Sequence, residues 1–429
     1  MSEFVPEGWK EGALSEFATI NPKLKSDVVL NDDVKVSFIK MEDVSNNAQI
    51  KNKRVRNYSE VSKGFTKFNN HDVLVAKITP CFENGKGGYA ENLVNGIGFG
   101  STEFHVLRAK TQSDSKYIYQ YTNYDSFRLA AEASMCGTGG QRRVQTDFIK
   151  TYRTAFPPLP EQQKIATILI SVDDVIEKTQ AQINKLKDLK TGMMQELLTR
   201  GVGVDGKPHA EFKDSPVGRI PKAWEVVKLS EIIGSMDGGV SVNGDNRLKT
   251  HKEIGVLKVS SVFKGSFIPH EHKVVIEEDL NRVKINPLKD RILFSRANTP
   301  SLVGESGYVE RNYDDLYLPD KIWMIDVKDR LKVNVRWLSY ILSSGKVRKL
   351  ICDAATGTSS SMKNISKPNL LSIQVGMPML EEQKAISDIL NLISNKLTLS
   401  STKLEHVKKL KKALMQDLLT GKVRVKVDS

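Results

Sequence analysis

The amino-acid sequence predicts an α+β protein built from two tandem domains, each followed by a long α-helix. Three observations predict this fold. The second half of the sequence restates the first, each half carries short apolar runs typical of strands, and each half closes on an extended helical pattern. A repeat this long exceeds the periods of stacked solenoids, so it indicates two related half-molecules.

The repeat is visible at matched short segments. Each half opens on a Pro-x-x-Trp motif, and three further pairs follow in the same order. The pairs are Pro6–Trp9 with Pro221–Trp224, Leu74–Lys77 with Leu293–Arg296, Gly88-Tyr89 with Gly307-Tyr308, and Gly137-Thr138 with Gly357-Thr358. We therefore expect two domains of one fold.

Each globular part mixes strand and helix signals. Short apolar runs bounded by turn residues predict strands at Val73–Ala76, Ile292–Phe294 and Ile322–Ile325. Tyr117–Ala133 and Val335–Cys352 instead have helical spacing. A domain of roughly 150 residues, within the usual range for one domain, accommodates these elements.

Two long helical segments with matching apolar positions are the clearest elements. The first, Glu161–Leu197, begins just after Pro157–Pro160, a stiff segment that stops a helix from extending backwards. Gly201 and Gly421 mark the two helix exits. The apolar spacings of three and four residues are those of a coiled-coil seam. The seam residues are Ile165, Leu169, Val172, Ile176, Ile183 and Leu186 in the first helix, and Ile386, Leu390, Ile393, Leu397, Leu404 and Val407 in the second.

The repeat of the helices continues beyond these positions. Leu189, Met193 and Leu197 correspond to Leu410, Leu414 and Leu418, and Thr179 interrupts the first seam where Ser400 interrupts the second. At 1.5 Å per residue each helix would run about 55 Å, too long for one small domain to cover. The simplest arrangement pairs the two seams as an antiparallel coiled coil with pseudo-twofold symmetry. The alternative is that each helix packs on its own domain.

An antiparallel pair would act as a ruler, because a globular domain precedes each helix and the two domains would lie at opposite ends. We place the domain boundaries accordingly, with the Gly-, Pro-, Asp- and Lys-rich segment between the halves as a linker. The expected parts are domain 1 at 1–157, helical spacer 1 at 158–200, the linker at 201–219, domain 2 at 220–377, helical spacer 2 at 378–422 and a C-terminal tail at 423–429.

Composition bounds the class of protein. The chain has 64 Lys and Arg against 51 Asp and Glu, a formal net charge of +13, which favours a polyanionic partner such as nucleic acid. Cys81, Cys136 and Cys352 are widely spaced and form no CxxC pair, so a disulfide framework or zinc site is not expected. No signal peptide or membrane-spanning run is expected. These features predict a cytoplasmic protein without a membrane partner.

Motifs for catalysis are incomplete. An adenine methyltransferase would normally carry an Asn/Asp-Pro-Pro-Tyr/Phe tetrad, but Pro157-Pro158 has other neighbours. Gly201–Lys207 has the spacing of a phosphate-binding loop, yet it follows a helix and ends at Pro208 rather than at Ser or Thr. We therefore expect no catalytic residues and no bound nucleotide.

Nuclease and metal sites are not expected either. Asp320 and Asp326 faintly resemble nuclease carboxylates, but alternation along Trp323–Val327 makes Asp326 a solvent-facing strand residue. His270 and His272 lack neighbouring ligands that would complete a metal site.

The motifs resemble those of specificity subunits of type I restriction-modification systems, over nearly the whole chain. The segment Pro158–Ala166 (PLPEQQKIA) carries the most specific resemblance, and its second copy, Pro378–Ile386, departs by one inserted residue before realigning. Both long helices also end on Met-Gln-acidic-Leu-Leu-Thr, at Met194–Thr199 and Met415–Thr420.

The resemblance implies a function. Each domain would be a target recognition domain reading half of a bipartite, asymmetric site in double-stranded DNA. The paired helices would set the gap, no more than roughly 15 base pairs for a rod of about 55 Å, and would bind two modification subunits. Those subunits would use S-adenosylmethionine to methylate adenine, and restriction subunits would use ATP and Mg²⁺. This chain itself would hold no cofactor.

Candidate DNA contacts are expected in loops. Polar side chains follow matched strands in both halves, and other long donors lie beside Gly-rich segments, where phosphate or base-edge contacts are possible. The candidates are Lys77, Thr79, Gln141, Arg142 and Arg143 in the first half, and Arg247, Arg296, Asn298, Ser360 and Lys363 in the second.

Two other functions fit the sequence. The chain could be the specificity subunit of a type II-like or orphan methyltransferase system, which neighbouring genes would reveal. It could also be a coiled-coil scaffold that binds no DNA, which a salt-dependent DNA affinity would exclude.

Overall fold

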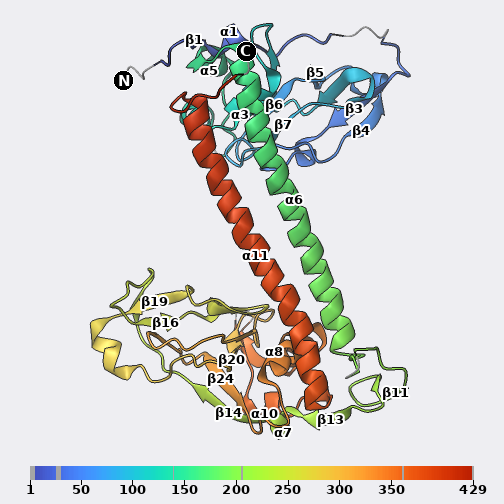
Figure 1. The fold of residues 1–429 in the computed structure, drawn as a ribbon, viewed down its shortest axis with the longest axis vertical. Coiled ribbons are helices and arrows are strands. Elements are labelled where there is room, and N and C mark those ends of the chain that lie inside the picture. The colour runs from blue at the N-terminus through green and yellow to red at the C-terminus, as the bar shows by residue number, and fades with distance from the viewer. Residues whose placement is uncertain (1–4, 26–29, 139, 204–205, 360–361, 428–429) are drawn as a thin grey trace. The chain divides into compact units, whose positions relative to one another are not determined.

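The structure is a computed structural model that describes residues 5–25, 30–138, 140–203, 206–359 and 362–427 (Figure 1). It divides into two compact units, one of Met1–Ala181 with Thr402–Ser429 and one of Gln182–Ser401. Each unit combines one globular domain with part of each long helix. The predicted α+β class with two domains and two long helices is confirmed.

Among the described residues of the first unit, three sheets form the globular domain. The first pairs β1 (Lys10–Ala13) with β10 (Arg153–Phe156). The second has the order β2 (Ala18–Ile20), β9 (Phe104–Ala109), β6 (Val73–Ala76), β7 (Gly87–Tyr89), and the third has the order β4 (Arg54–Asn57), β3 (Lys35–Ile39), β8 (Ile97–Gly100), β5 (Thr66–Asn69). The predicted strand Val73–Ala76 is confirmed, and all four of its side chains are buried, with Val73 and Val75 in one core cluster and Leu74 in another.

Short helices cover these sheets. They are α1 (Leu14–Phe17), α2 (Tyr58–Val61), α3 (Ser115–Thr122), α4 (Asp125–Ala133) and α5 (Thr146–Thr151), with 3₁₀ turns at Met41–Asp43 and Val94–Gly96. The helical spacing predicted over Tyr117–Ala133 is present as two helices, α3 and α4, rather than one. Asp114 caps α3 by accepting a hydrogen bond from the backbone N–H of Tyr117 at 2.8 Å.

The second unit has a larger set of sheets. The main sheet has the order β14 (Ile233–Gly238), β24 (Ile322–Val327), β20 (Ile292–Ser295), β22 (Ser306–Tyr308), β18 (Gly265–Phe267), β17 (Val262–Phe263). A second sheet has the order β15 (Gly244–Asp245), β19 (His272–Val275), β16 (Gly255–Leu257), β23 (Leu316–Tyr317). Smaller sheets join β21 (Ala297–Asn298), β26 (Met362–Asn364) and β25 (Thr356–Ser359), then β13 (Glu225–Lys228) with β27 (Gln374–Met377), and β11 (Phe212–Lys213) with β12 (Ile220–Pro221).

The helices of this domain are α7 (Leu229–Ile232), α8 (Val335–Ser343), α9 (Gly345–Ala354) and α10 (Lys367–Leu371), with 3₁₀ turns at Val259–Ser261 and Glu277–Arg282. The helical spacing predicted over Val335–Cys352 again divides into two helices. Ser344 separates them and has an extended backbone.

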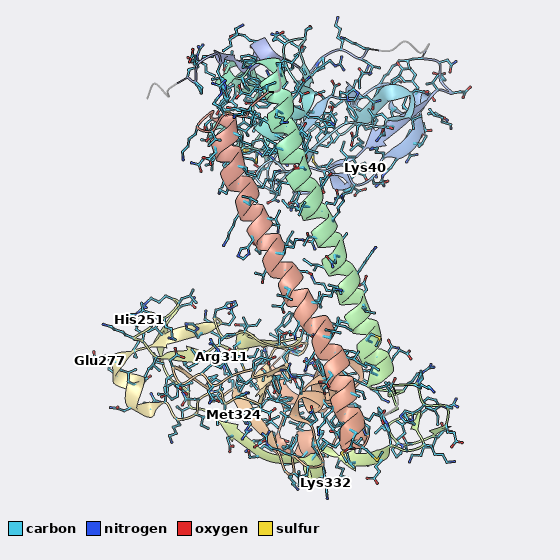
Figure 2. The ribbon with its side chains drawn as sticks, in the orientation of Figure 1. Lys40, His251, Glu277, Arg311, Met324 and Lys332 are labelled. Atoms are coloured by element: carbon cyan, nitrogen blue, oxygen red, sulfur yellow. The ribbon has the colours of Figure 1, made fainter. Side chains whose placement is uncertain are left out.

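The alternation expected along β24 is wrong. Trp323, Met324 and Ile325 are all buried, because the strand is covered on both faces (Met324 is labelled in Figure 2). Asp326 is half-buried rather than solvent-facing and forms ion pairs with Arg291 at 2.9 Å and Arg330 at 2.7 Å. Its carboxylate is thus neutralised by two guanidinium groups.

The long helices are α6 (Leu159–Leu197) and α11 (Leu380–Leu419). The prediction that the first helix begins after Pro160 is wrong by two residues. Pro160 is the second helical residue, where its missing N–H would have no helical partner in any case. Gly201 and Gly421, at the expected exits, have positive φ of 69° and 71°.

Each unit pairs the beginning of one long helix with the end of the other. In the first unit, Ile165 and Leu169 of α6 share a core with Met415 and Leu418 of α11. In the second unit, Leu197 of α6 shares a core with Ile386 and Leu390 of α11. The helices therefore pair antiparallel, and the alternative in which each packs only on its own domain is wrong.

The seam positions differ in burial. Eight are buried, and four are half-buried: Val172, Ile176, Leu397 and Val407. The buried ones are Ile165, Leu169, Ile183, Leu186, Ile386, Leu390, Ile393 and Leu404. Assignment of these residues as the pairing seam stays a prediction. The repeated positions Leu189 and Leu410 are exposed by 49% and 53%, so apolar repetition alone does not mark a packed residue.

A buried glutamate sits at the third residue of each long helix. Glu161 of α6 accepts hydrogen bonds from Trp9 Nε1 at 3.3 Å and from the guanidinium of Arg424 at 2.7 and 2.8 Å. The hydrogen bonds to Glu161 raise the pKa of the Arg424 guanidinium and so stabilise its charged form. We call this group the first start clamp.

The second start clamp is centred on Glu382 of α11. Its carboxylate accepts hydrogen bonds from Trp224 Nε1 at 3.0 Å, from the backbone N–H of Val202 at 3.0 Å and from His209 Nε2 at 2.9 Å. A Cβ on Gly201 would lie 2.3 Å from the Glu382 carboxylate, so the close approach requires glycine there. Each clamp thus joins a domain's opening tryptophan, a helix start and the segment that follows the other helix.

The glutamine that follows each clamp glutamate also has a structural role, because it binds the proline segment before the helix. Gln162 Nε2 donates to the carbonyl of Pro157, and Gln383 Nε2 donates to that of Pro378, both at 2.8 Å. Gln383 also donates to the carbonyl of Lys332, a residue labelled in Figure 2, at 3.0 Å. The insertion expected in the second copy is wrong, because the Pro, Glu and Gln of both copies have the same roles at the same spacing.

Within the residues that the structure describes, no helix is both long enough and apolar enough to cross a membrane.

Candidate nucleic-acid interface

The loop after β6 and the segment after the Gly-rich turn meet in the first domain. The N–H of Thr79 donates to the carbonyl of Arg142, and the N–H of Val144 donates to the carbonyl of Lys77, both at 2.9 Å. Ile78 and Arg143 form the antiparallel bridge between them. Candidate residues far apart in sequence therefore lie together. We call Lys77, Thr79, Gln141, Arg142 and Arg143 reader cluster 1.

Two carboxylates hold the basic side chains of reader cluster 1. Arg143 binds Glu103 in a bidentate manner, with Nη2–Oε1 and Nε–Oε2 distances of 2.9 and 3.0 Å. This hydrogen bonding lowers the pKa of Glu103. Arg142 Nη2 lies 3.4 Å from Glu83 Oε1, which also accepts a hydrogen bond from the Thr79 hydroxyl at 2.8 Å.

Gln141 is exposed, and its carbonyl accepts a hydrogen bond from Arg143 Nη1 at 3.2 Å. Lys77 is half-buried, and its N–H donates to the carbonyl of Glu103 at 2.9 Å. Gly139, part of the predicted Gly-rich turn, lies outside the described residues. Reader cluster 1 thus presents the exposed Gln141 and Arg142 beside the partly exposed Arg143.

A buried histidine contacts the backbone next to reader cluster 1. His105 lies on β9, with Nε2 at 2.8 Å from the carbonyl of Val144 and Nδ1 at 3.4 Å from Asn21 Nδ2. The two contacts fit one neutral tautomer, in which Nε2 donates and Nδ1 accepts. Burial is the largest influence on this imidazole and lowers its pKa from 6.5, with nearby Lys77 acting in the same direction and Glu103 opposing it.

We expect His105 to make stability depend on pH. The native state disfavours the imidazolium, so between the lowered pKa and 6.5 the unfolded chain binds more protons. The stabilisation is complete above 6.5 and is lost as pH falls through the lowered native pKa. We therefore expect the difference in unfolding free energy between the wild type and His105→Gln to shrink as pH falls below 6.5. Urea denaturation across pH 5–8 measures it, and a constant difference would contradict the prediction.

An equivalent cluster lies in the second domain, and we call its residues Arg296, Asn298 and Lys363 reader cluster 2. The N–H of Arg296 donates to the carbonyl of Lys321 at 3.0 Å, and the N–H of Ile365 donates to the carbonyl of Arg296 at 2.9 Å. These bonds repeat those made by Lys77 in the first domain. Asn298 pairs with Lys363 across β21 and β26. The backbone frame is therefore conserved between the clusters.

The side chains of reader cluster 2 differ from those of cluster 1. Arg296 Nη1 donates to Asn364 Oδ1 at 3.1 Å, and Nε donates to the carbonyl of Asp320 at 2.7 Å. The guanidinium lies 6.0 Å from the Trp323 ring, and Lys367 Nζ lies 5.8 Å from that ring. Asn298 Oδ1 accepts from the N–H of Thr299 at 2.8 Å.

Two candidates stand apart. Ser360 lies outside the described residues. Arg247 follows β15 and forms an ion pair with Glu253, whose pKa it lowers to about 2 mainly through their hydrogen bonds. None of its described contacts reaches reader cluster 2.

Reasoning from the sequence missed Glu83, Glu103, Trp323 and Lys367. The contacts of Glu83 and Glu103 depend on tertiary geometry, although Glu103 adjoins the strand that pairs with Val73–Ala76. Alignment of the two halves was the available signal, since Lys321 occupies the position of Glu103.

Among the described residues, no group of three or more His, Cys, Asp or Glu side chains is placed to hold a metal ion. His272 is satisfied by the backbone instead, with Nε2 accepting from the N–H of Lys249 at 3.0 Å and Nδ1 lying 2.8 Å from the carbonyl of Pro269.

Comparison with known proteins identifies a family model that matches the chain twice. The model, described as the type I restriction modification DNA specificity domain, matches residues 6–188 and 221–409. Each match therefore covers one globular domain and most of the helix that follows it.

Curated relatives match both halves. The EcoEI type I restriction enzyme specificity subunit of Escherichia coli is 27% identical over 464 residues, covering 90% of this chain and 77% of that protein. The MjaVIII type I restriction enzyme specificity subunit of Methanocaldococcus jannaschii is 29% identical over 373 residues, covering 85% and 84%.

Solved structures share the fold. The type I restriction-modification S subunit from M. genitalium matches with a TM-score of 0.60 at 14% identity, covering 98% of this chain and 97% of that one. A chain from a study of type I R-M system assembly and conformational transition matches with a TM-score of 0.52 at 16% identity, covering 98% and 100%.

Proposed function

The chain belongs to the family of type I restriction modification DNA specificity domains, and we propose that it selects the DNA sequence for a type I restriction-modification complex. It is a recognition subunit rather than a catalyst. The observation that carries this conclusion is that both family matches contain a reader cluster on the same backbone frame. Each domain would read one half of a bipartite site.

The different side chains of the clusters indicate an asymmetric site. Cluster 1 offers Arg142 and Arg143, whereas cluster 2 offers Arg296 beside an asparagine. Arginine prefers the O6 and N7 acceptors of guanine, and asparagine prefers the N6 and N7 atoms of adenine. Domains with different donors would select different half-sites. The proposed DNA-contacting residues are Lys77, Thr79, Gln141, Arg142, Arg143, Arg247, Arg296, Asn298, Ser360 and Lys363.

The proposed partners are double-stranded DNA, two modification subunits that carry S-adenosylmethionine, and restriction subunits that use ATP and Mg²⁺. The chain itself would supply no cofactor. Since the substrate would be cellular DNA, we propose a cytoplasmic location. We also propose the domain limits given above, with recognition domains at 1–157 and 220–377 and helical spacers at 158–200 and 378–422.

Mapping of methylated adenines tests this function. DNA is sequenced by a method that detects N6-methyladenine, from cells that co-express the chain and the methyltransferase subunit encoded beside it. We expect methylation on both strands of a split, asymmetric motif, and replacement of one domain by that of a relative should change only one half of it. If no methylation depended on the chain, the proposal would be wrong.

A further inference from the structure

Reader cluster 1 contains an acidic side chain where a DNA-binding surface would gain from a basic one. Glu103 binds Arg143 through two parallel hydrogen bonds at 2.9 and 3.0 Å, and the two side chains are 25% and 38% exposed. DNA can therefore reach the pair. Among the described residues, the guanidinium of Arg143 donates otherwise only to the carbonyl of Gln141, at 3.2 Å, so Glu103 is its main ligand.

A carboxylate offers arginine the same pair of acceptors as DNA does. A phosphate group and the O6–N7 edge of guanine both accept two parallel N–H bonds from one guanidinium. Glu103 thus competes directly with any DNA acceptor that Arg143 could bind. Its negative charge also repels phosphate, so a DNA contact must offer more than charge attraction.

In the described part of the second domain no carboxylate occupies the place of Glu103, so that domain is a natural comparison. Lys321 occupies the place of Glu103, because its carbonyl accepts from Arg296 as that of Glu103 accepts from Lys77. Asn364 occupies the place of Arg143, because Ile365 donates to the carbonyl of Arg296 as Val144 donates to that of Lys77. Arg296, the counterpart of Lys77, donates to the neutral side chain of Asn364, and its guanidinium lies 4.0 Å from the Asp320 carboxylate. One chain therefore contains a reader cluster with a bidentate carboxylate and one without it.

We propose that Glu103 is a specificity-determining residue that competes with DNA phosphate for Arg143, so that Arg143 is released only to a matching base edge. This inference rests on the proposed function. With non-matching DNA, exchange of Glu103 for a phosphate replaces one bidentate anion by another and gains little. A matching half-site adds base contacts from the rest of the cluster, and these drive the exchange.

The test replaces Glu103 by Gln in the complex with the methyltransferase subunit. Gln is isosteric but removes the charge, so Arg143 becomes free to bind phosphate. We expect affinity for a duplex without the motif to rise by about 3- to 10-fold, and the slope of log affinity against log salt to steepen by about 0.9, the value for one added phosphate contact. Affinity for the matching duplex should change less.

Methylation mapping provides the second readout. Glu103→Gln should relax the half-site read by the first domain and leave the other half-site unchanged, so the second domain is an internal control. Glu103→Asp, which keeps the charge, should retain most of the wild-type specificity. Glu60→Gln is the matched control, since it removes a carboxylate from the Arg56–Glu60 pair, at 3.2 Å, in the same domain.

The outcomes separate the inference from the function. If Glu103→Gln weakened binding to the matching duplex and left other DNA unaffected, Glu103 would orient Arg143 and the inference would be overturned. An unchanged motif in both Glu103→Gln and Arg143→Ala would also overturn it, with the proposed function intact. If the wild-type chain directed no methylation, the proposed function and the inference would fail together.

Discussion

Replacement of Glu382 by Ala is expected to lower the free energy of unfolding of the second unit by about 3–5 kcal/mol. The carboxylate is 4% exposed and accepts hydrogen bonds from Trp224, Val202 and His209. Truncation leaves the buried donors of Trp224 and Val202 and the half-buried donor of His209 without this acceptor, and it opens a cavity. Urea denaturation followed by tryptophan fluorescence measures the effect, because Trp224 is itself buried.

The neighbouring Glu381→Ala is the matched control. Glu381 is exposed on the same turn of α11, so its removal is expected to change stability by no more than about 0.5 kcal/mol. Glu382→Gln, which keeps one oxygen but places an amide N–H among donors, should fall between the two. Equal stabilities of Glu382→Ala and Glu381→Ala would show that the second start clamp contributes nothing.

Insertion of seven residues into both long helices is expected to move methylation to a site whose gap is about three base pairs wider. This follows from the hypothesis that helix length separates the recognition domains, since seven helical residues add about 10 Å and DNA rises 3.4 Å per base pair. The insertions belong after Ala181 and after Ser401, where the two compact units divide. Contacts inside each unit are then kept, and two added turns preserve the coiled-coil spacing.

Methylation mapping in the insertion variant gives the result directly, because half-site sequences should stay the same while the gap changes. A seven-residue insertion after the exposed Asp214, in the turn that joins β11 to β12, is the control and should leave the gap unchanged. Methylation of the insertion variant at the original spacing would refute the ruler.

The architecture could be predicted because it depends on two kinds of pattern that are visible in the sequence, the apolar runs of the strands and the apolar spacing of the long helices. Apolar runs predicted β6 and β20, and coiled-coil spacing predicted α6 and α11. The positions where one helical pattern divides into two helices could not be predicted from the sequence. Ser344 separates α8 from α9 through its backbone conformation, which apolar periodicity does not report.

The site was predictable only in part, because a reader cluster is assembled by strand pairing across long sequence separations. Lys77 and Arg143 were both identified, but their common partner Glu103 was not, since its role depends on tertiary geometry. Arg247 stays a proposed DNA contact, but its ion pair could not be predicted from the sequence. A basic residue in a polar loop resembles a DNA contact, yet its guanidinium is bound by Glu253.

The first start clamp has a consequence for biosynthesis. The core of the first unit includes Met415, Leu418 and Leu419, and its buried Glu161 is paired with Arg424. The ribosome makes these residues after the whole of the second unit, which is contiguous from Gln182 to Ser401. The second unit can therefore complete its core during translation, whereas the first must keep part of its apolar surface open until α11 has been made.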